Sequence, residues 1–399
     1  MEKLLLLGGS AQQIVAIETA KKNGLYTVLC DYLPDNPGQY VADKFYLVST
    51  TDKEKILEVA RKENISGVLA YASDPAAPTA AYVAEKLRLP GNPYESVEIL
   101  CNKDRFRRFL NNNNFVTPLA RGYEFENQAY SDLKRRVFDL PVIIKPVDSS
   151  GSKGITIVNS LENARMAIEF AFSFSRNHRI VIEEYIEKKH PYLIGGDVFV
   201  VDGKIVLWGL LNCHRDERVN KLVPVGKSFP LQLDDSDIEN VKNTIQMLVD
   251  KLAIKFGAMN VELLVDKNNR VYLIDIGPRS GGNLIPDLLG MIFGVDIVEW
   301  SIKMAMGLEI DVSTKCEEVY YATHNLHACK NGYLSQIRFS PELEKYIIRE
   351  FIYKKQGDKI EYFDNASKAL GVIFLKFPNE KEMKVILENI VDEIQIVYQ

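Results

Sequence analysis

The sequence is poor in cysteine, and its cysteines form no recognisable motif. They are scattered and include no C-x-x-C pair, which favours neither a disulfide framework nor a zinc site. This usage fits a protein of the reducing cytoplasm. The five lie at Cys30, Cys101, Cys213, Cys316 and Cys329.

Excess positive charge is also missing, since the net charge of the 399 residues is −5. Nucleic acids and anionic membranes bind basic surfaces, so neither is expected as a partner. No apolar stretch approaches the roughly 20 residues needed to span a bilayer, and we expect the leucine run in MEKLLLLGGS to be a buried first strand. Hydrophobic residues at 46% predict a globular protein, and its length predicts two or three domains around a shared cleft.

Two common nucleotide-binding motifs are absent as well. The turn Gly8-Gly9-Ser10 and Asp31 carry only part of the G-x-G-x-x-G fingerprint, so a nicotinamide or flavin site is disfavoured. A P-loop needs G-K-[ST] at the start of a helix. The loop Ser149–Gly154 is instead followed by GITIV, whose β-branched residues predict a strand, so we expect this loop at the tip of a hairpin.

The order of apolar segments predicts an α/β protein with an α+β tail. From Lys3 to about Asn92, short apolar strands alternate with amphipathic helices, which indicates a parallel sheet in a Rossmann-like unit. The stretch LPGNPYES marks a boundary. A basic helix follows over residues 102–114, and strands dominate from Pro141 onward.

Two later hairpins carry the polar residues of most interest. In DVFVVDGKIVLWGLL, the pair Asp202-Gly203 predicts a two-residue turn, and a polar loop is expected after it, over residues 212–230. The second hairpin is NVELLVDKNNRVYLIDIGPR, residues 260–279. A two-residue turn at Asn268-Asn269 places Glu262 opposite Asp275 and Asn260 opposite Gly277.

The two facing acids are the unusual feature of this second hairpin. Side chains directly opposite each other have Cβ atoms about 4.5–5.5 Å apart, and like charges there destabilise the pair. Either Mg²⁺, which binds one or two carboxylates together with substrate phosphates, or Lys and Arg neighbours, or a shared proton must offset the repulsion. With a period of two, Asn260, Glu262 and Asp275 share one face, and the core face carries Val261, Leu263, Val265, Ile274 and Ile276.

Lys145 and the loop after it point to an anion. A lysine inside the apolar strand VIIKP is costly unless its ammonium meets an anion or reaches solvent at a sheet edge. The loop combines glycines, which let backbone N–H groups approach phosphate oxygens, with serine hydroxyls; the alternative is a flexible connector. Downstream, RIVIEEYI over 179–186 is either an ordinary strand end or a hinge that holds a purine.

These parts, taken in order, resemble the ATP-grasp superfamily over essentially the whole chain. They are a Rossmann-like front, a lysine helix, a K-P strand with a serine/glycine loop, an E-E-Y-I hinge and an acidic hairpin ending in P-R. The segment DIGPRSGGNLIPDLLGMIFGVDIVEWSIKMAMG is most similar to the group around L-amino acid ligases, carbamoyl-phosphate synthetase and biotin carboxylase. The resemblance implies four regions: a Rossmann-like domain (1–96), a central and lid region (97–190), a catalytic region (191–318) and a small α+β subdomain (319–399).

The resemblance also implies ATP and Mg²⁺, or Mn²⁺ in its place, as cofactors, with Glu262 and Asp275 as metal ligands. The hinge would hold adenine through the backbone of Glu184 and Ile186, and Asp197 is the candidate for the ribose. Arg279 would steady the transferred phosphate and, with Lys145, act in catalysis. The implied ATP-binding residues are Lys103, Lys145, Ser149, Ser150, Gly151, Ser152, Gly154, Glu183, Glu184, Tyr185, Ile186 and Asp197.

This chain departs from the superfamily pattern at the second acid. Relatives usually carry E-I-N-P-R, whereas this chain has Asp275 in place of the glutamate and Gly277 in place of the asparagine. Asn260, which faces Gly277 on the hairpin count, is the candidate to supply the missing oxygen.

The implied activity is that of a carboxylate–amine ligase working through an acyl phosphate on a small carboxylic or amino acid. A homodimer and a cytoplasmic location are implied with it. Two alternatives stay open, an ATP-dependent carboxylase that uses bicarbonate and an ATP-binding protein without catalysis. Candidate substrate-binding residues are Asp74, which alternatively caps a helix, and His214, Arg215, Arg279, Ser280, Gly281 and Gly282.

Overall fold

The front of the chain is a parallel sheet with helices on both faces. The computed structural model describes residues 1–315 and 318–399, so Cys316 lies outside the described part. The strand order is β3-β2-β1-β4. On one face, Leu5 and Leu7 pack with α2 (Lys53–Glu63) and α3 (Ala77–Leu87). On the other face, Leu4 and Leu6 pack with α1 (Ile14–Lys22) and α10 (Ile297–Ala305). The strands are β1 (Lys3–Leu7), β2 (Tyr26–Asp31), β3 (Lys44–Leu47) and β4 (Gly67–Leu69), with α1 (Ile14–Lys22), α2 (Lys53–Glu63) and α3 (Ala77–Leu87).

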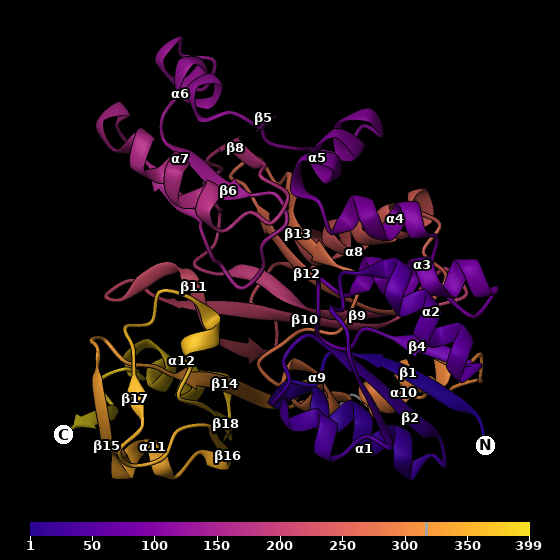
Figure 1. Cartoon of the computed structure of the whole chain (residues 1–399). Coiled ribbons are helices and arrows are strands. Elements are labelled where there is room, and N and C mark those ends of the chain that lie inside the picture. The colour runs from indigo at the N-terminus through magenta and orange to yellow at the C-terminus, as the bar shows by residue number, and fades with distance from the viewer. Residues whose placement is uncertain (316–317) are drawn as a thin grey trace.

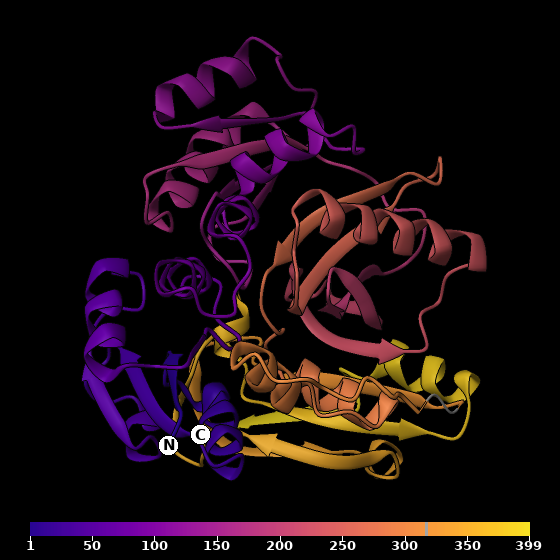
Figure 2. The same cartoon turned by 90° about the vertical axis from the view of Figure 1, so that its right-hand side faces the viewer.

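A second sheet, also of four strands, stands at the top of Figures 1 and 2. It is antiparallel, with the order β5-β8-β6-β7. Two helices, α4 (Tyr94–Leu100) and α5 (Lys103–Asn112), lead into it from the front domain. Its elements are β5 (Ala120–Tyr123), β6 (Val142–Pro146), β7 (Thr156–Val158) and β8 (Ile180–Glu184), with α6 (Glu126–Lys134) and α7 (Ala164–Ser173).

The largest sheet has eight strands in the order β13-β12-β9-β10-β11-β14-β18-β16. Along β9, Val198 and Val200 pack against α8 on one face, while Phe199 packs against α9 and α10 on the other. The bounds are β9 (Leu193–Val201), β10 (Lys204–Asp216), β11 (Asn220–Phe229), β12 (Gly257–Val265), β13 (Val271–Gly277), β14 (Tyr320–Leu326), β16 (Ile347–Ile352) and β18 (Gly371–Phe377). The helices are α8 (Asp235–Lys251), α9 (Ile285–Phe293) and α10 (Ile297–Ala305).

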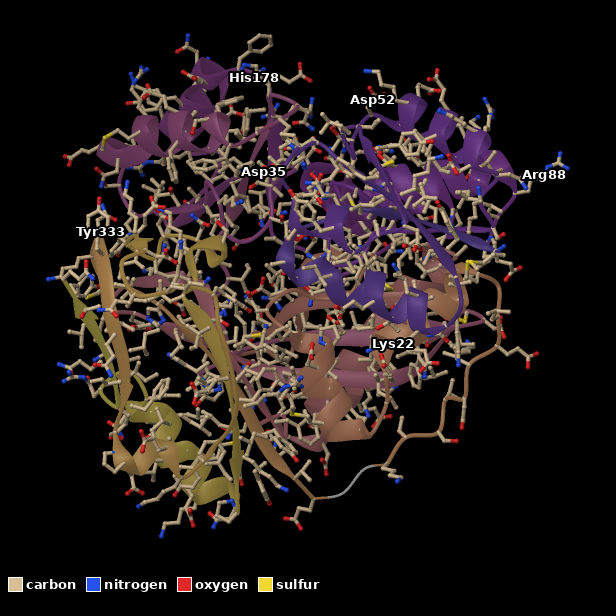
Figure 3. The ribbon with its side chains drawn as sticks, turned by 60° about the horizontal axis from the view of Figure 1, so that its bottom comes forward. Lys22, Asp35, Asp52, Arg88, His178 and Tyr333 are labelled. Carbon is tan, nitrogen blue, oxygen red and sulfur yellow. The ribbon has the colours of Figure 1, made fainter. Side chains whose placement is uncertain are left out.

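The tail contributes three strands of this sheet, β14, β18 and β16. Its other strands, β15 (Gly332–Phe339), β17 (Lys359–Ile360) and β19 (Ile394–Tyr398), form a small sheet beside α11 (Pro341–Glu344) and α12 (Glu380–Asn389). The mixed α/β and α+β fold is therefore as expected, and the four-region division stays a prediction. Polar side chains such as Lys22, Arg88 and Tyr333 lie on the outside of the molecule (Figure 3). None of the described helices has the length and apolar character to cross a membrane.

One expected loop is in fact part of the large sheet. Residues 212–230 belong mostly to β10 and β11, which pair through Asn212–Ser228 and Cys213–Lys227. Val223 and Val225 are buried, so the stretch has an inward face that its polar composition hides. The neighbouring Asp202-Gly203 turn is confirmed, because Val201 pairs with Lys204.

The acidic hairpin has the predicted pairing but a different turn. Glu262 pairs with Asp275, and Asn260 with Gly277, as expected. The turn is a three-residue loop over 267–269, since Val265 pairs with Val271 and the Asp266 N–H donates to the Arg270 carbonyl at 3.0 Å. The register then shifts by one residue next to Glu262, so Ile274 is inserted and only partly buried. The core face therefore carries Val271, Leu273 and Ile276, and the expectation for Ile274 was wrong.

Candidate active site

A cavity of about 350 Å³ lies where the front domain, the β6–β7 loop, the large sheet and the tail meet. It brings together residues from all four parts of the chain. The expected site residues on its wall are Asp74, Lys103, Ser149, Ser150, Gly151, Ser152, Glu262, Asp275, Arg279 and Gly282. Asn260, the candidate for the missing oxygen, and Lys153 of the expected loop lie there too. Further residues that were not expected there are Gln12, Lys227, Asn283, Thr323 and Asn325.

The two facing carboxylates each have a cation beside them. Lys103 Nζ lies 3.2 Å from Asp275 Oδ2, and Arg215 Nη2 lies 2.5 Å from Glu262 Oε1. Burial raises the pKa of Glu262, but the charges of Arg215 and Lys227 bring it below its ordinary value. The two cations are thus one source of the charge that offsets the repulsion.

Both acids still offer oxygen atoms to the cavity, because their side chains are 29% and 38% exposed. Among the described residues, no cluster of three or more His, Cys, Asp or Glu side chains forms a metal site. Two carboxylates suit Mg²⁺, which takes its other ligands from water and phosphate oxygens. The assignment of Glu262 and Asp275 as metal ligands stays a prediction, and their oxygen donors fit it.

The glycine at position 277 makes room for an ion pair. Arg279 Nη2 donates to Asp74 Oδ2, and a Cβ on Gly277 would lie 2.6 Å from Asp74 Oδ1. Asn260, across the ladder, donates both amide hydrogens, to the Gly196 carbonyl at 3.0 Å and to Asp197 Oδ1 at 2.8 Å. Its amide oxygen is the atom that remains for the cavity, and its role as a metal ligand stays a prediction.

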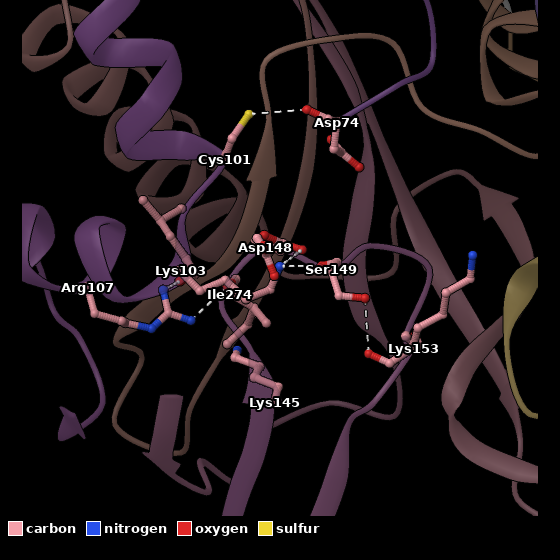
Figure 4. Close-up of polar contacts among 12 residues, drawn as sticks. Asp74, Cys101, Lys103, Arg107, Lys145, Asp148, Ser149, Lys153 and Ile274 are labelled. Atoms are coloured by element: carbon pink, nitrogen blue, oxygen red, sulfur yellow. Dashed lines mark hydrogen bonds and ion pairs between the residues drawn. The ribbon is translucent and has the colours of Figure 1, made fainter. Parts of the chain in front are cut away.

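The β6–β7 loop rests on three other parts of the protein. Lys103 Nζ donates to the Ser149 carbonyl at 2.8 Å (Figure 4), so the helix that begins at Lys103 holds the start of the loop. Ser152 Oγ donates to the Leu222 carbonyl on β11 at 3.0 Å. The Ala366 N–H of the tail donates to the Gly151 carbonyl at 3.4 Å. The loop therefore covers the cavity in this structure.

Lys145 has its anion inside the protein. Its ammonium lies 2.7 Å from Glu183 Oε2, and Arg107 Nε lies 2.9 Å from Glu183 Oε1, with all three side chains buried. Burial lowers the pKa of Lys145. Burial raises that of Glu183, but Arg107 and Lys145 bring it down to about 2.

Arg107 was missed because charged helix faces are usually solvated. It lies on the buried face of α5 and also donates to the Leu273 and Ile274 carbonyls of the acidic hairpin (Figure 4). The only signal for it is its spacing of three from the buried Leu110 and four from Lys103. It ties the lysine helix, the hinge strand and the hairpin together.

The hinge residues lie off the wall of the cavity. The Glu184 N–H donates to the Leu119 carbonyl at 2.9 Å, and Glu184 Oε2 accepts from the Leu119 N–H at 3.3 Å. Tyr185 is exposed, and Ile186 is partly buried. A role for this hinge in adenine binding stays a prediction.

Asp197 has its own backbone partner. Both of its oxygens accept from the Gly281 N–H, at 2.8 and 3.0 Å, and burial raises its pKa to about 6. It therefore holds the segment Ser280–Gly282 against the sheet. Arg279 Nε, just before this segment, and the Ser280 hydroxyl are buried and have no hydrogen-bond partner among the described residues.

His214 and Arg215 separate in the structure. Arg215 reaches Glu262, whereas the half-buried His214 ring lies away from the cavity wall, with Nε2 2.8 Å from Ser228 Oγ. Burial, with the charges of Lys227 and Arg215, lowers the pKa of His214 to about 3.

The family follows from the sequence of this site region. The signature of the family described as "Carbamoyl-phosphate synthase L chain, ATP binding domain" matches residues 102–313, more than half of the chain. The chain belongs to the ATP-grasp superfamily. This superfamily comprises ADP-forming, ATP-dependent ligases and carboxylases, and ATP with Mg²⁺ is typical of it.

Two curated relatives differ in how much of them this ATP-grasp chain covers. It is 29% identical over 409 residues to a formate-dependent phosphoribosylglycinamide formyltransferase from Prochlorococcus marinus, covering 99% of this chain and 98% of the relative. It is 24% identical over 326 residues to the carbamoyl phosphate synthase large chain of Thermotoga petrophila. That match covers 77% of this chain but only 28% of the synthase.

Two solved structures share the ATP-grasp fold. An L-amino acid ligase from Bacillus licheniformis superposes with a TM-score of 0.82 at 20% identity, covering 100% of this chain and 99% of the ligase. The biotin carboxylase domain of a Hydrogenobacter thermophilus 2-oxoglutarate carboxylase, solved with MgADP and bicarbonate, has a TM-score of 0.72 at 17% identity, covering 99% and 90%.

Proposed function

We propose that this protein is an ATP- and Mg²⁺-dependent carboxylate–amine ligase. The observation that carries the proposal is a single cavity with two facing carboxylates, a serine/glycine loop held by a lysine, and an arginine whose buried Nε has no partner in the described part of the chain. Phosphoryl transfer needs charge neutralisation and positioning more than a protein nucleophile, and this set of side chains provides both.

The reaction has two steps. A carboxylate oxygen of the acceptor attacks the γ-phosphorus of ATP, and the bond between that phosphorus and the β–γ bridging oxygen breaks, which releases ADP and leaves an acyl phosphate. The amine nitrogen then attacks the acyl carbon, phosphate leaves, and the amine proton passes to solvent.

Each role falls on a residue of the cavity or its support. Bound Mg²⁺ would be held by Glu262 and Asp275 and would supply positive charge at the phosphates. Lys103 and the β6–β7 loop would bind the phosphates, and Arg279 would face the oxygens of the transferred group. Lys145 acts indirectly, because it and Arg107 fix Glu183 and through it the hinge strand β8.

The names of the relatives support a carboxylate acceptor and also keep the alternative open. Formate is a small carboxylate, and an L-amino acid ligase takes acids that carry an amine. The structure solved with bicarbonate supports the carboxylase as the second candidate. The biotin carboxylase domain is described as a dimer, which supports the proposal of a homodimer here.

A phosphate-release assay tests the activity. Purified protein with ATP and Mg²⁺ is offered pooled amino acids and small carboxylates, each with and without added amines. We expect ADP formation that requires both a carboxylate and an amine. Turnover with bicarbonate and no amine would contradict the ligase proposal in favour of the carboxylase. ATP binding without any ADP formation would favour the remaining alternative, an ATP-binding protein without catalysis.

The acid pair gives a sharper variant test of the same proposal. Glu262→Gln and Asp275→Asn are each expected to lower kcat by about two orders of magnitude or more, as expected when a group that stabilises transition-state charge is removed. The control is Asp250→Asn on α8, whose pair with Lys204 is solvent-exposed. Wild-type rates in either acid variant would remove the metal assignment.

A further inference from the structure

The cations that line the cavity differ in whether they have a carboxylate partner. Lys103 is paired with Asp275, and Arg279 with Asp74. Two other cations of the wall, Lys227 on β11 and Lys153 in the β6–β7 loop, are different: within the described chain, no carboxylate oxygen lies within 4 Å of either ammonium. Of these two, Lys227 is part of the sheet, and its hydrogen-bonding neighbour is the buried thiol of Cys213. A half-buried ammonium without an anion is unfavourable, so a ligand anion at this point would be stabilised.

The position of the Lys227 ammonium is built into the sheet. A Cβ on Gly195 of β9 would lie 2.7 Å from Lys227 Nζ and 2.5 Å from Cys213 Sγ. The glycine therefore leaves the space in which the lysine extends across β9. Gly195 pairs with Glu262 on β12, so the ammonium lies over the strand next to that of the first acid.

Sheet order separates Lys227 from the lysine that holds the β6–β7 loop. The strands run β13, β12, β9, β10, β11, β14, and Lys103 lies at the β13 side, against Asp275. Lys227 approaches Glu262 from the β11 side, and its register partner on β14 is Thr323. The two lysines therefore approach the acid pair from opposite sides, which is the arrangement that a phosphate donor and an anionic acceptor require.

The wall on the β14 side of Lys227 is small and polar. Thr323 and Asn325 come from the tail strand, and Ser367 from the segment that contacts the β6–β7 loop. No Phe, Tyr or Trp is among the described residues that line the cavity. A ligand bound here therefore has no aromatic surface on which to stack.

We propose that Lys227 binds the carboxylate of the acceptor, and that Thr323 and Asn325 of the tail restrict that acceptor to a small polar acid. This assignment rests on the proposed ligase function and deepens it. The acceptor carboxylate then lies between Lys227 and the metal-binding acids, facing the phosphate to be transferred.

The test compares three variants in one assay. Lys227→Met removes the charge, Lys227→Arg keeps it, and Lys204→Met on the surface is the control. With formate, acetate and succinate as probes, we expect Lys227→Met to raise the KM for the active carboxylate by about tenfold or more, as for the loss of a hydrogen bond to a charged group. The KM for ATP should stay within about twofold, and Lys227→Arg should restore part of the loss.

Calorimetry with MgADP-saturated protein and the same probes separates this assignment from the activity itself. Carboxylate binding by the wild type that is lost in Lys227→Met supports the assignment even if no ADP forms, and in that case only the ligase proposal fails. An increase in the KM for ATP alone would move Lys227 to the phosphates and overturn the assignment. Unchanged constants in Lys227→Met, or no carboxylate binding by the wild type, would overturn it as well.

Discussion

At the scale of single residues, the buried triad of Glu183, Lys145 and Arg107 has the largest consequence for stability. Glu183 sits between two cations, and its side chain is 3% exposed. Removing the central charge leaves two cations buried side by side without an anion. Buried ion pairs are costly to break one partner at a time.

We therefore expect Glu183→Gln to lower the free energy of unfolding by about 3–5 kcal/mol, measured by urea denaturation. The matched control is Glu380→Gln on α12, which removes an exposed i,i+4 pair with Lys384 and should change it by less than about 0.5 kcal/mol. Equal losses of unfolding free energy in the two variants would show that the triad does not stabilise the fold as expected.

A second residue, His214, makes stability depend on pH. Burial holds its pKa at about 3 in the folded protein, against about 6.5 when unfolded. Below pH 6.5 the unfolded chain therefore binds a proton at His214, whereas the folded protein does not bind it until the pH approaches 3. Stability falls as the pH drops toward 3, by at most about 1.4 kcal/mol per pH unit from this group.

His214→Gln should flatten the loss of stability between pH 6.5 and pH 4, measured as urea midpoints at several pH values. His178→Gln serves as the control, because that ring is exposed. Identical pH slopes in the His214 variant and the wild type would contradict the assigned direction.

Residue roles were predictable where they depend on neighbours along the chain. The facing of Glu262 and Asp275 follows from one hairpin, so its two strands suffice to predict it. The contact between Arg107 and Glu183 joins residues 76 positions apart, and no local pattern specifies it. For the same reason Lys145 was predicted to need an anion, but the anion was not identified.

At the scale of elements, the acidic hairpin was predicted correctly despite a wrong turn. Asn268-Asn269 reads as a two-residue turn, yet Asn269 adopts φ 60° at the end of a three-residue loop, a common hairpin form. The inserted Ile274 compensates for the longer turn, so that Glu262 still pairs with Asp275. β11 and the end of β10, from Asn212 to Asp216, were missed because polar side chains are buried there, such as Asn212 and Ser228, which are hydrogen-bonded to each other. These strands therefore lack the alternation of an ordinary half-buried strand.

The β6–β7 loop gives a prediction at this scale. Gly154 has φ 74°, and a Cβ there would lie 2.8 Å from Pro146 Cγ and 2.9 Å from Phe174 Cβ. Gly24 has almost the same backbone, φ 75°, with nothing within 4 Å of an added Cβ. The two glycines therefore share the strain of a left-handed residue and differ only in the clash.

Gly24→Ala should cost about 1–2 kcal/mol of stability, and Gly154→Ala should cost more and also raise the Kd for MgATP, because its loop must shift. Urea denaturation and calorimetric titration measure the two effects. An unchanged Kd for MgATP in Gly154→Ala would argue that the loop does not contact the nucleotide.

At the scale of the whole molecule, the tail is part of the central sheet. Phe374 on β18 is fully buried in the cluster that contains Phe199 of β9 and Trp300 of α10. Trp300 packs edge-on against Phe199 with ring centroids 5.2 Å apart. From the sequence, the tail was predicted to be a smaller α+β unit of its own. Its pairing with the large sheet, through β11 and β14, joins residues about a hundred positions apart and leaves no local signal in the sequence.

This shared core predicts that the tail and the rest unfold together. Both tryptophans, Trp208 and Trp300, lie outside the tail, so their fluorescence reports on the remainder, whereas far-UV circular dichroism reports on all elements. Phe374→Ala should cost about 3–5 kcal/mol and shift the urea midpoints of both signals equally, while Val385→Ala on the exposed face of α12 should shift neither. If Phe374→Ala moved only the dichroism transition and left the tryptophan transition in place, the tail would be an independent unit. The polar wall that the tail contributes to the cavity would then open without unfolding of the front domain or of strands β9 to β13.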